Sequence, residues 1–132
     1  MVIDTSAFVA ILFDEAERGA FVDILASDSV LSVSAVNFYE ASLVIAARRE
    51  DADAVSMLDG IIEDFRIEIA PVDTRAAMAA RAAYFRFGKG YHPAKLNLAD
   101  CFSYSLAKGR DEMLLFKGND FLKTDIVPAW RP

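Results

Sequence analysis

Four carboxylates in or beside apolar segments are the residues of this chain best suited to chemistry: Asp4, Glu40, Asp100 and Asp120. Carboxylates that converge on one place repel one another unless a cation neutralises them. An oxygen-only donor set suits Mg²⁺ or Mn²⁺ rather than zinc. The sequence therefore predicts an acidic site for a divalent metal, provided that the fold brings these side chains together.

Three of these acids also have an ordinary structural interpretation. Asp4 follows an apolar segment and suits a helix N-cap. Asp100 stands three residues after Asn97, where an acid complements the dipole of a helix. Asp120 belongs to a Gly-Asn-Asp sequence that is typical of a turn. Taken singly, each of these positions therefore leaves both interpretations open.

Glu40 is less easily explained by local structure. On a helix that begins at Ser34, it shares a face with four apolar residues, Val36, Leu43, Val44 and Ala47. An unpaired carboxylate on a buried face is costly, so Glu40 needs a cation or a hydrogen-bond network. A salt bridge, or a place at the edge of the stripe, would also satisfy it.

Short apolar segments that alternate with amphipathic ones predict the elements that must position these acids. We expect strands over residues 1–3, 29–33, 66–70 and 113–116, with a further short strand at 126–127. We expect helices over residues 5–13, 15–26, 34–49, 52–64, 74–88 and 97–108. Strands separated by helices predict an α/β fold, a three-layer α/β/α sandwich with a mainly parallel sheet. Ligands of such sheets bind beyond the carboxyl ends of the strands, where Asp4 and the turn at Asp120 are expected.

Composition narrows the class of protein. The chain has 132 residues, of which 55% are hydrophobic and 26% charged, which predicts a single globular domain over residues 1–132. The single cysteine, Cys101, excludes an intrachain disulfide and a Cys-based zinc cluster, and His92 is the only histidine. The sequence has no apolar run long enough for a membrane span and no signal peptide at Met1, so we expect a cytoplasmic protein.

The net charge of -6 argues against a protein that coats nucleic acid by bulk charge. The charge is nevertheless uneven, because residues 74–99 contain five bases and no acid and the remainder therefore carries -11. Aromatic residues are interleaved with these bases, and such mixtures bind phosphates and stack on unpaired bases. We expect four of the bases to bring RNA to the acidic site: Arg81, Arg86, Lys89 and Lys95. A solvated basic helix face with its aromatics in the core is the alternative.

Four segments together resemble the PIN-domain ribonucleases, and among them the VapC toxins of type II VapBC toxin–antitoxin pairs. The segments comprise residues 2–7 (VIDTSA), 34–40 (SAVNFYE), 96–102 (LNLADCF) and 114–121 (LLFKGNDF), and they span almost the whole chain. The resemblance implies a PIN-like fold and an endoribonuclease that depends on Mg²⁺ or Mn²⁺. It places Asp4, Glu40 and Asp100 on the three core acidic positions of the family.

The fourth acidic position is less regular in this sequence. The resemblance assigns it to Asp120, although many relatives have two acids in this turn and one of them is Asn119 here, with Asp125 as a distant reserve. The hydroxyls of Thr5 and Ser6 could support the substrate phosphate or a metal-bound water, or could simply belong to the helix start.

The resemblance also implies partners. Family members bind a VapB antitoxin, often in an apolar groove, and the apolar segment from Phe8 to Phe13 could line such a groove here. A homodimer is expected as well. Two other functions remain open: a catalytically weak PIN-fold domain that binds RNA or a partner protein, and a receiver-like signalling domain. The latter fits poorly, because no paired acids follow the first strand.

Overall fold

The computed structural model describes residues 1–27 and 30–131 and contains one four-stranded parallel sheet. Its strands are β1 (Val2–Ile3), β2 (Ser32–Ser34), β3 (Glu68–Ala70) and β4 (Leu114–Leu115), in the order β3-β2-β1-β4. The expected parallel α/β architecture is confirmed. Of the strand predicted over 29–33, position 29 lies outside the described residues. The strand predicted at 126–127 is wrong: the structure has only an isolated bridge between Leu114 and Pro128 there.

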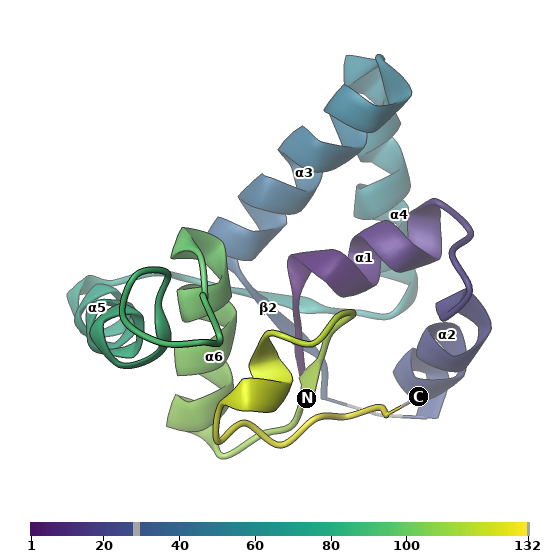
Figure 1. Ribbon diagram of the computed structural model, residues 1–132. Helices are drawn as coiled ribbons and strands as arrows, with labels where there is room; N and C mark the ends of the chain where they lie inside the picture. The colour runs from purple at the N-terminus through teal and green to yellow at the C-terminus, as the bar shows by residue number, and fades with distance from the viewer. Residues whose placement is uncertain (28–29, 132) are drawn as a thin grey trace.

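Six α-helices connect and cover the strands: α1 (Thr5–Leu12), α2 (Arg18–Ser27), α3 (Ala35–Arg49), α4 (Val55–Asp64), α5 (Thr74–Phe87) and α6 (Leu98–Arg110). Two 3₁₀ turns, η1 (Ala52–Ala54) and η2 (Phe121–Lys123), complete the chain. Figure 1 shows α5 and α6 together on one side of the sheet, α1 and α2 on the other, and α3 and α4 projecting from it. In the described ranges, none of the helices is both long and apolar enough to cross a membrane.

Two hydrophobic clusters on opposite faces of the sheet make up the layers. Side chains of a strand alternate between faces, so Ile3 and Leu115 pack with helices α1 to α4, whereas Val2 and Leu114 pack with α5 and α6. Both faces of the central strands are therefore buried, as the wholly apolar sequence of β1 predicts, and the two serines of β2 are buried with them.

Six of the eight residues of helix α1 are buried, and this corrects one expectation. Phe8, Ala10 and Ile11 belong to the core beneath the sheet and are at most 6% exposed. Phe13 follows the helix and is covered by the guanidinium group of Arg48, 5.0 Å from its ring centroid. Phe8, Ala10 and Ile11 are thus occupied by intramolecular packing and are not available to line an open groove, which stays a prediction for the rest of the segment.

Candidate active site

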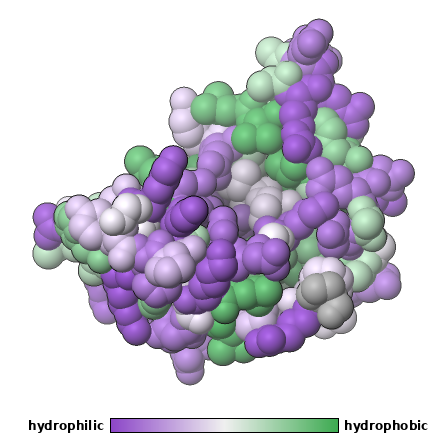
Figure 2. Space-filling view, in the orientation of Figure 1, coloured by the Kyte–Doolittle hydropathy of each residue, from purple (hydrophilic) through white to green (hydrophobic). Residues whose placement is uncertain are grey.

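Three of the four predicted acids line one open cavity of about 510 Å³ beyond the carboxyl ends of the strands. Asp4 follows β1, Glu40 lies on α3 after β2, and Asp100 lies in the first turn of α6. The cavity is lined by Asp4, Thr5, Ser6, Val9, Glu15, Glu40, Arg48, Asn97, Asp100 and Lys117. Figure 2 shows hydrophilic side chains gathered on the face of the molecule seen in Figure 1. The parallel topology thus brings these acids to one edge of the sheet, as the sequence predicted.

Asp4 is buried and is held by hydrogen bonds to both of its carboxylate oxygens. Its Oδ2 accepts from the backbone N–H and the hydroxyl of Ser6, at 2.9 and 2.6 Å, so Asp4 is indeed the N-cap of α1. Its Oδ1 accepts from the buried hydroxyl of Ser103 at 2.6 Å. The two interpretations of Asp4 are therefore compatible, because capping fixes the carboxylate at the edge of the cavity.

Glu40 is half-buried at the edge of the α3 core face rather than within it. The buried residues of α3 are Asn37, Ala41 and Ile45, whereas Leu43 is 52% exposed. The predicted stripe through Val36, Leu43 and Ala47 was therefore one position out of phase with the true core face. The hydroxyl of Thr5 donates to Glu40 Oε2 at 2.5 Å.

Burial is the largest influence on the pKa of Glu40 and raises it above 4.5. The hydrogen bond from Thr5 lowers this pKa, and the nearby charge of Asp4 raises it. Glu40 is thus held by a hydrogen bond from a neutral hydroxyl. Among the described residues, Glu40 does not form the salt bridge that the sequence left open.

Asp100 combines a structural role with a strongly shifted pKa. It forms a capping box with Asn97: each side chain accepts a hydrogen bond from the other residue's backbone N–H, at 2.7 and 2.9 Å. Burial raises the pKa of Asp100 to about 7, against the lowering effect of the Asn97 N–H. The charges of Asp4, Glu40 and Asp120 contribute to this rise, so all three acids are close enough to act on Asp100.

The donor chemistry of this cavity fits a hard divalent cation. Asp4, Glu40 and Asp100 offer only oxygen ligands, and their mutual repulsion is what such a cation would relieve. Across residues 1–27 and 30–131, however, no three His, Cys, Asp or Glu side chains form a ready-made metal cluster. Each acid instead accepts a hydrogen bond from a neighbouring residue.

The other acidic candidates lie outside this cavity. Asp120 is exposed before η2, 3.7 Å from the ammonium group of Lys123, and Asn119 beside it is exposed too. Asp125 accepts a hydrogen bond from the hydroxyl of Tyr104 at 2.6 Å and pairs with Arg86 at 3.4 Å. Asp120 thus acts on Asp100 through its charge, whereas Asp125 belongs to a separate network.

The four basic candidates separate into two groups. Arg81 and Lys89 line a second, largely apolar cavity of about 550 Å³ between α5 and α6, and Asn97 lines both cavities. Arg86 pairs with Asp125 and stacks on Phe87, with 4.6 Å from its guanidinium carbon to the ring centroid, and Lys95 is exposed. Of these four candidates, Arg81 and Lys89 therefore lie nearest the acidic cavity, whereas Arg48 and Lys117, which the sequence analysis did not single out, line the cavity itself.

Similarity to known proteins identifies the family to which this chain belongs. The PIN domain family matches residues 1–127. Ribonuclease VapC28 of Mycobacterium tuberculosis is 45% identical over 130 residues, which cover 98% of this chain and 97% of the relative. Ribonuclease VapC of Mycolicibacterium smegmatis is 44% identical over 127 residues, covering 96% of this chain and 98% of the relative. This chain belongs to the PIN-domain family. Among PIN domains, the VapC ribonucleases match it from end to end, and the receiver-like alternative is removed.

Solved PIN-domain structures share the fold at low sequence identity. The Mycobacterium tuberculosis toxin VapC20, described as cleaving the sarcin-ricin loop, superposes with a TM-score of 0.79 at 19% identity, covering 99% of this chain and 98% of that one. VapBC2 of Rickettsia felis, bound to a promoter DNA fragment, gives a TM-score of 0.73 at 13% identity, covering 96% of this chain and 94% of that one. These likenesses support the fold of this PIN domain.

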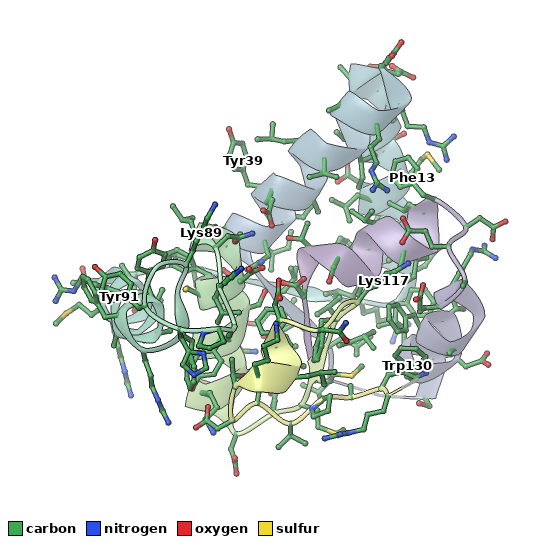
Figure 3. The ribbon with its side chains drawn as sticks, in the orientation of Figure 1. Phe13, Tyr39, Lys89, Tyr91, Lys117 and Trp130 are labelled. Carbon is green, nitrogen blue, oxygen red and sulfur yellow. The ribbon has the colours of Figure 1, made fainter. Side chains whose placement is uncertain are left out.

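Sequence reasoning missed several residues of the PIN-domain site. Asn37 and Ser103 are buried polar residues that donate hydrogen bonds to Asp4 Oδ1. Each of them is a polar residue on an otherwise apolar helix face. This pattern can be recognised in the sequence only when the buried face of the helix is assigned correctly. Lys117 was missed as well: its ammonium group lies 2.8 Å from the carboxylates of both Glu15 and Glu17 at the rim of the cavity (Figure 3).

Proposed function

We infer that this PIN domain is a divalent-metal-dependent endoribonuclease and acts as the toxin of a toxin–antitoxin pair. The observation that carries the metal dependence is the shared cavity of Asp4, Glu40 and Asp100, three acids from segments far apart in the sequence. Its relatives of 43 to 45% identity are named as ribonucleases, which supports RNA as the substrate.

Asp4, Glu40 and Asp100 would hold Mg²⁺ or Mn²⁺. When bound, such an ion lowers the pKa of a coordinated water and stabilises the oxygens of a phosphate undergoing in-line displacement. Burial raises the pKa of Glu40, which makes its carboxylate a better proton acceptor than an exposed glutamate. The hydroxyls of Thr5 and Ser6 orient Glu40 and Asp4 through the bonds described above, which is the role we assign to them in place of direct contact with the phosphate.

Arg81 and Lys89 would bind the RNA strand beside the acidic cavity. Both line the neighbouring cavity, which meets the acidic one at Asn97. Cationic side chains there would offset the repulsion between the phosphates and the acids. We assign Arg86 a smaller part than the sequence suggested, because it already pairs with Asp125. Asp120 remains the proposed fourth acid, acting through its charge on Asp100.

A cognate VapB-type antitoxin is the proposed protein partner. Two structural neighbours are described as toxin–antitoxin assemblies, one from Klebsiella pneumoniae and the other from Rickettsia felis. We also propose a homodimer, since Tyr39, Leu43 and Leu98 leave large apolar side chains exposed on α3 and at the start of α6. Light scattering of the purified chain with and without Leu98→Asp tests the dimer: the variant should be a monomer.

The experiment that tests the activity uses purified protein freed of antitoxin and of metal. A pool of transfer and ribosomal RNA should be cut after addition of Mg²⁺ or Mn²⁺, and EDTA should stop cleavage. Asp4→Asn, Glu40→Gln and Asp100→Asn should each abolish cleavage while the circular dichroism spectrum remains that of the wild type. RNA binding by the wild-type chain with no cleavage at any tested concentration of Mg²⁺ or Mn²⁺ would instead favour the catalytically weak domain, for which Asn119 in the turn is the motivating observation.

A further inference from the structure

Asn37 is a fully buried polar residue whose position connects the separate parts of the acidic site. It lies on the core face of α3, three residues before Glu40, with 0% of its surface exposed. The other residues of this face, Ala41 and Ile45, are apolar. A carboxamide in such a place is costly unless its polar atoms are paired, so its contacts indicate what the side chain contributes.

The Asn37 side-chain nitrogen faces three acceptors from two other segments. Nδ2 lies 3.1 Å from the backbone oxygen of Ala99, 3.3 Å from Thr5 Oγ1 and 3.4 Å from Asp4 Oδ1. A carboxylate oxygen and a backbone carbonyl can only accept, and this assigns the nitrogen, rather than the oxygen, to this side of the carboxamide. Thr5, in turn, donates to Glu40.

These contacts reach every segment that carries one of the three proposed metal ligands. Asp4 is contacted directly, Glu40 is reached through Thr5, and Ala99 immediately precedes Asp100. Ser103 also donates to Asp4 Oδ1, but this bond connects only α6 with Asp4. Asn37 on α3 therefore contacts both of the other segments, whereas Thr5 reaches only α3 and Ser103 reaches only Asp4.

The second polar atom of the carboxamide indicates that stability alone does not account for Asn37. Its Oδ1 is buried and has no hydrogen-bond partner among the residues that the structure describes. An unsatisfied buried acceptor costs about 1–3 kcal/mol, which offsets part of what the Nδ2 hydrogen bonds contribute to stability. Retaining the carboxamide is thus explained by what its N–H groups hold in place.

We propose that Asn37 is a positioning residue that sets the placement of Asp4, Glu40 and Asp100 for metal binding. The proposal rests on the function inferred above. It assigns to Asn37 no contact with substrate or metal, and its effect passes through Asp4, through Thr5 and through the backbone before Asp100. Polar residues that orient metal ligands in this way commonly change metal affinity by about 10- to 100-fold when they are removed.

The test compares Mn²⁺ affinity, measured by isothermal titration calorimetry on the metal-free chain, with thermal stability. Asn37→Ala should raise the Mn²⁺ dissociation constant about ten-fold or more. Asn37→Thr, which keeps the volume and one donor, should fall between this variant and the wild type, and it also serves if Asn37→Ala does not fold. Tyr104→Phe is the matched control, because it removes a buried hydroxyl that binds Asp125 away from the cavity. It should lower the melting temperature and leave Mn²⁺ affinity within two-fold of the wild type.

Steady-state cleavage provides a second readout. Loss of Asn37 should lower kcat and leave KM for RNA nearly unchanged, since Arg81 and Lys89 are untouched. Wild-type Mn²⁺ affinity and kcat in both Asn37 variants would overturn the proposal while the proposed function stands. A wild-type chain that binds no Mn²⁺ would remove the metal site itself, and the positioning role with it.

Discussion

Thr5 donates a hydrogen bond to Glu40, with 2.5 Å between Oγ1 and Oε2, and so connects two positions that are 35 residues apart in the chain. The bond joins the first residue of α1 to the α3 residue that faces the acidic cavity. It is the interaction that lowers the pKa of a glutamate whose burial acts in the opposite direction.

The first prediction concerns this bond. Thr5→Val keeps the side-chain volume but removes the hydroxyl, so the pKa of Glu40 should rise above its wild-type value. Thr5→Ser keeps the hydroxyl and should leave it close to wild type. The carboxyl carbon of Glu40, followed by NMR titration of the metal-free protein, gives the comparison. An identical titration in Thr5→Val would mean that the bond does not act on Glu40.

The second prediction concerns the pH dependence of stability without metal. The pKa of Asp100 is about 7 in the folded chain and 3.8 for an ordinary aspartate, so between these values the folded state binds more protons than the unfolded state. Stability should therefore be greatest at the acid end of this window and fall as the pH rises through about 7. Melting temperatures measured in EDTA from pH 5 to 8 should show the fall, and Asp100→Asn should flatten it. Equal slopes in the two proteins would contradict the prediction.

The third prediction concerns Ser103. Its hydroxyl is buried and donates to a carboxylate, so Ser103→Ala should lower the free energy of unfolding by about 1.5–3 kcal/mol. Ser105→Ala, on the same helix, removes a hydroxyl that reaches only the Phe102 carbonyl at 3.3 Å and should cost less. Urea denaturation of both variants measures the difference. Similar losses would show that the bond to Asp4 contributes nothing particular.

The fourth prediction separates the two groups of bases. Arg81→Ala/Lys89→Ala should weaken RNA binding and make it less dependent on salt, with the log–log slope reduced by about 1.4 for two lost phosphate contacts. Arg86→Ala/Lys108→Ala removes the same charge from two residues that already pair with Asp125, and its slope should stay nearer to wild type. RNA affinities of both double variants, measured at several salt concentrations in the inactive Asp100→Asn background, give the two slopes. Equal slopes in the two double variants would reject the assignment.

The placement of Asp4 and Asp100 at one edge of the sheet was predictable from sequence, because a parallel sheet has all its strand carboxyl ends at the same edge. A short apolar strand followed by Asp4, and a helix start before Asp100, place both acids beyond strand ends whatever the details of packing. The same reasoning could not place Asp120, because a turn after β4 can direct its side chain into the cavity or away from it. In the structure Asp120 is exposed, and the turn contains Gly118 with a φ of +104°, a conformation that glycine adopts without strain.

The α3 core face was less predictable for a different reason. Apolar residues lie on two adjoining faces of this helix, and hydrophobic periodicity alone does not tell which one the rest of the chain covers. The face of Leu43 was predicted to be buried, whereas tertiary packing buries the face of Asn37 and Ile45. This error in phase hid Asn37, since a polar residue on an assumed solvent face needs no explanation.

The bond between Ser103 and Asp4 spans 99 residues, and strand β1 is completed by pairing with β4 near the end of the chain. During synthesis, an emerging N-terminal portion carries Asp4, Glu40 and β2, which is one neighbour of β1, but it lacks Asp100 and the other neighbour, β4. The three acids can therefore share one cavity only after α6 has been made and has packed beside β1. The order in which the chain is made thus places completion of this cavity late in synthesis.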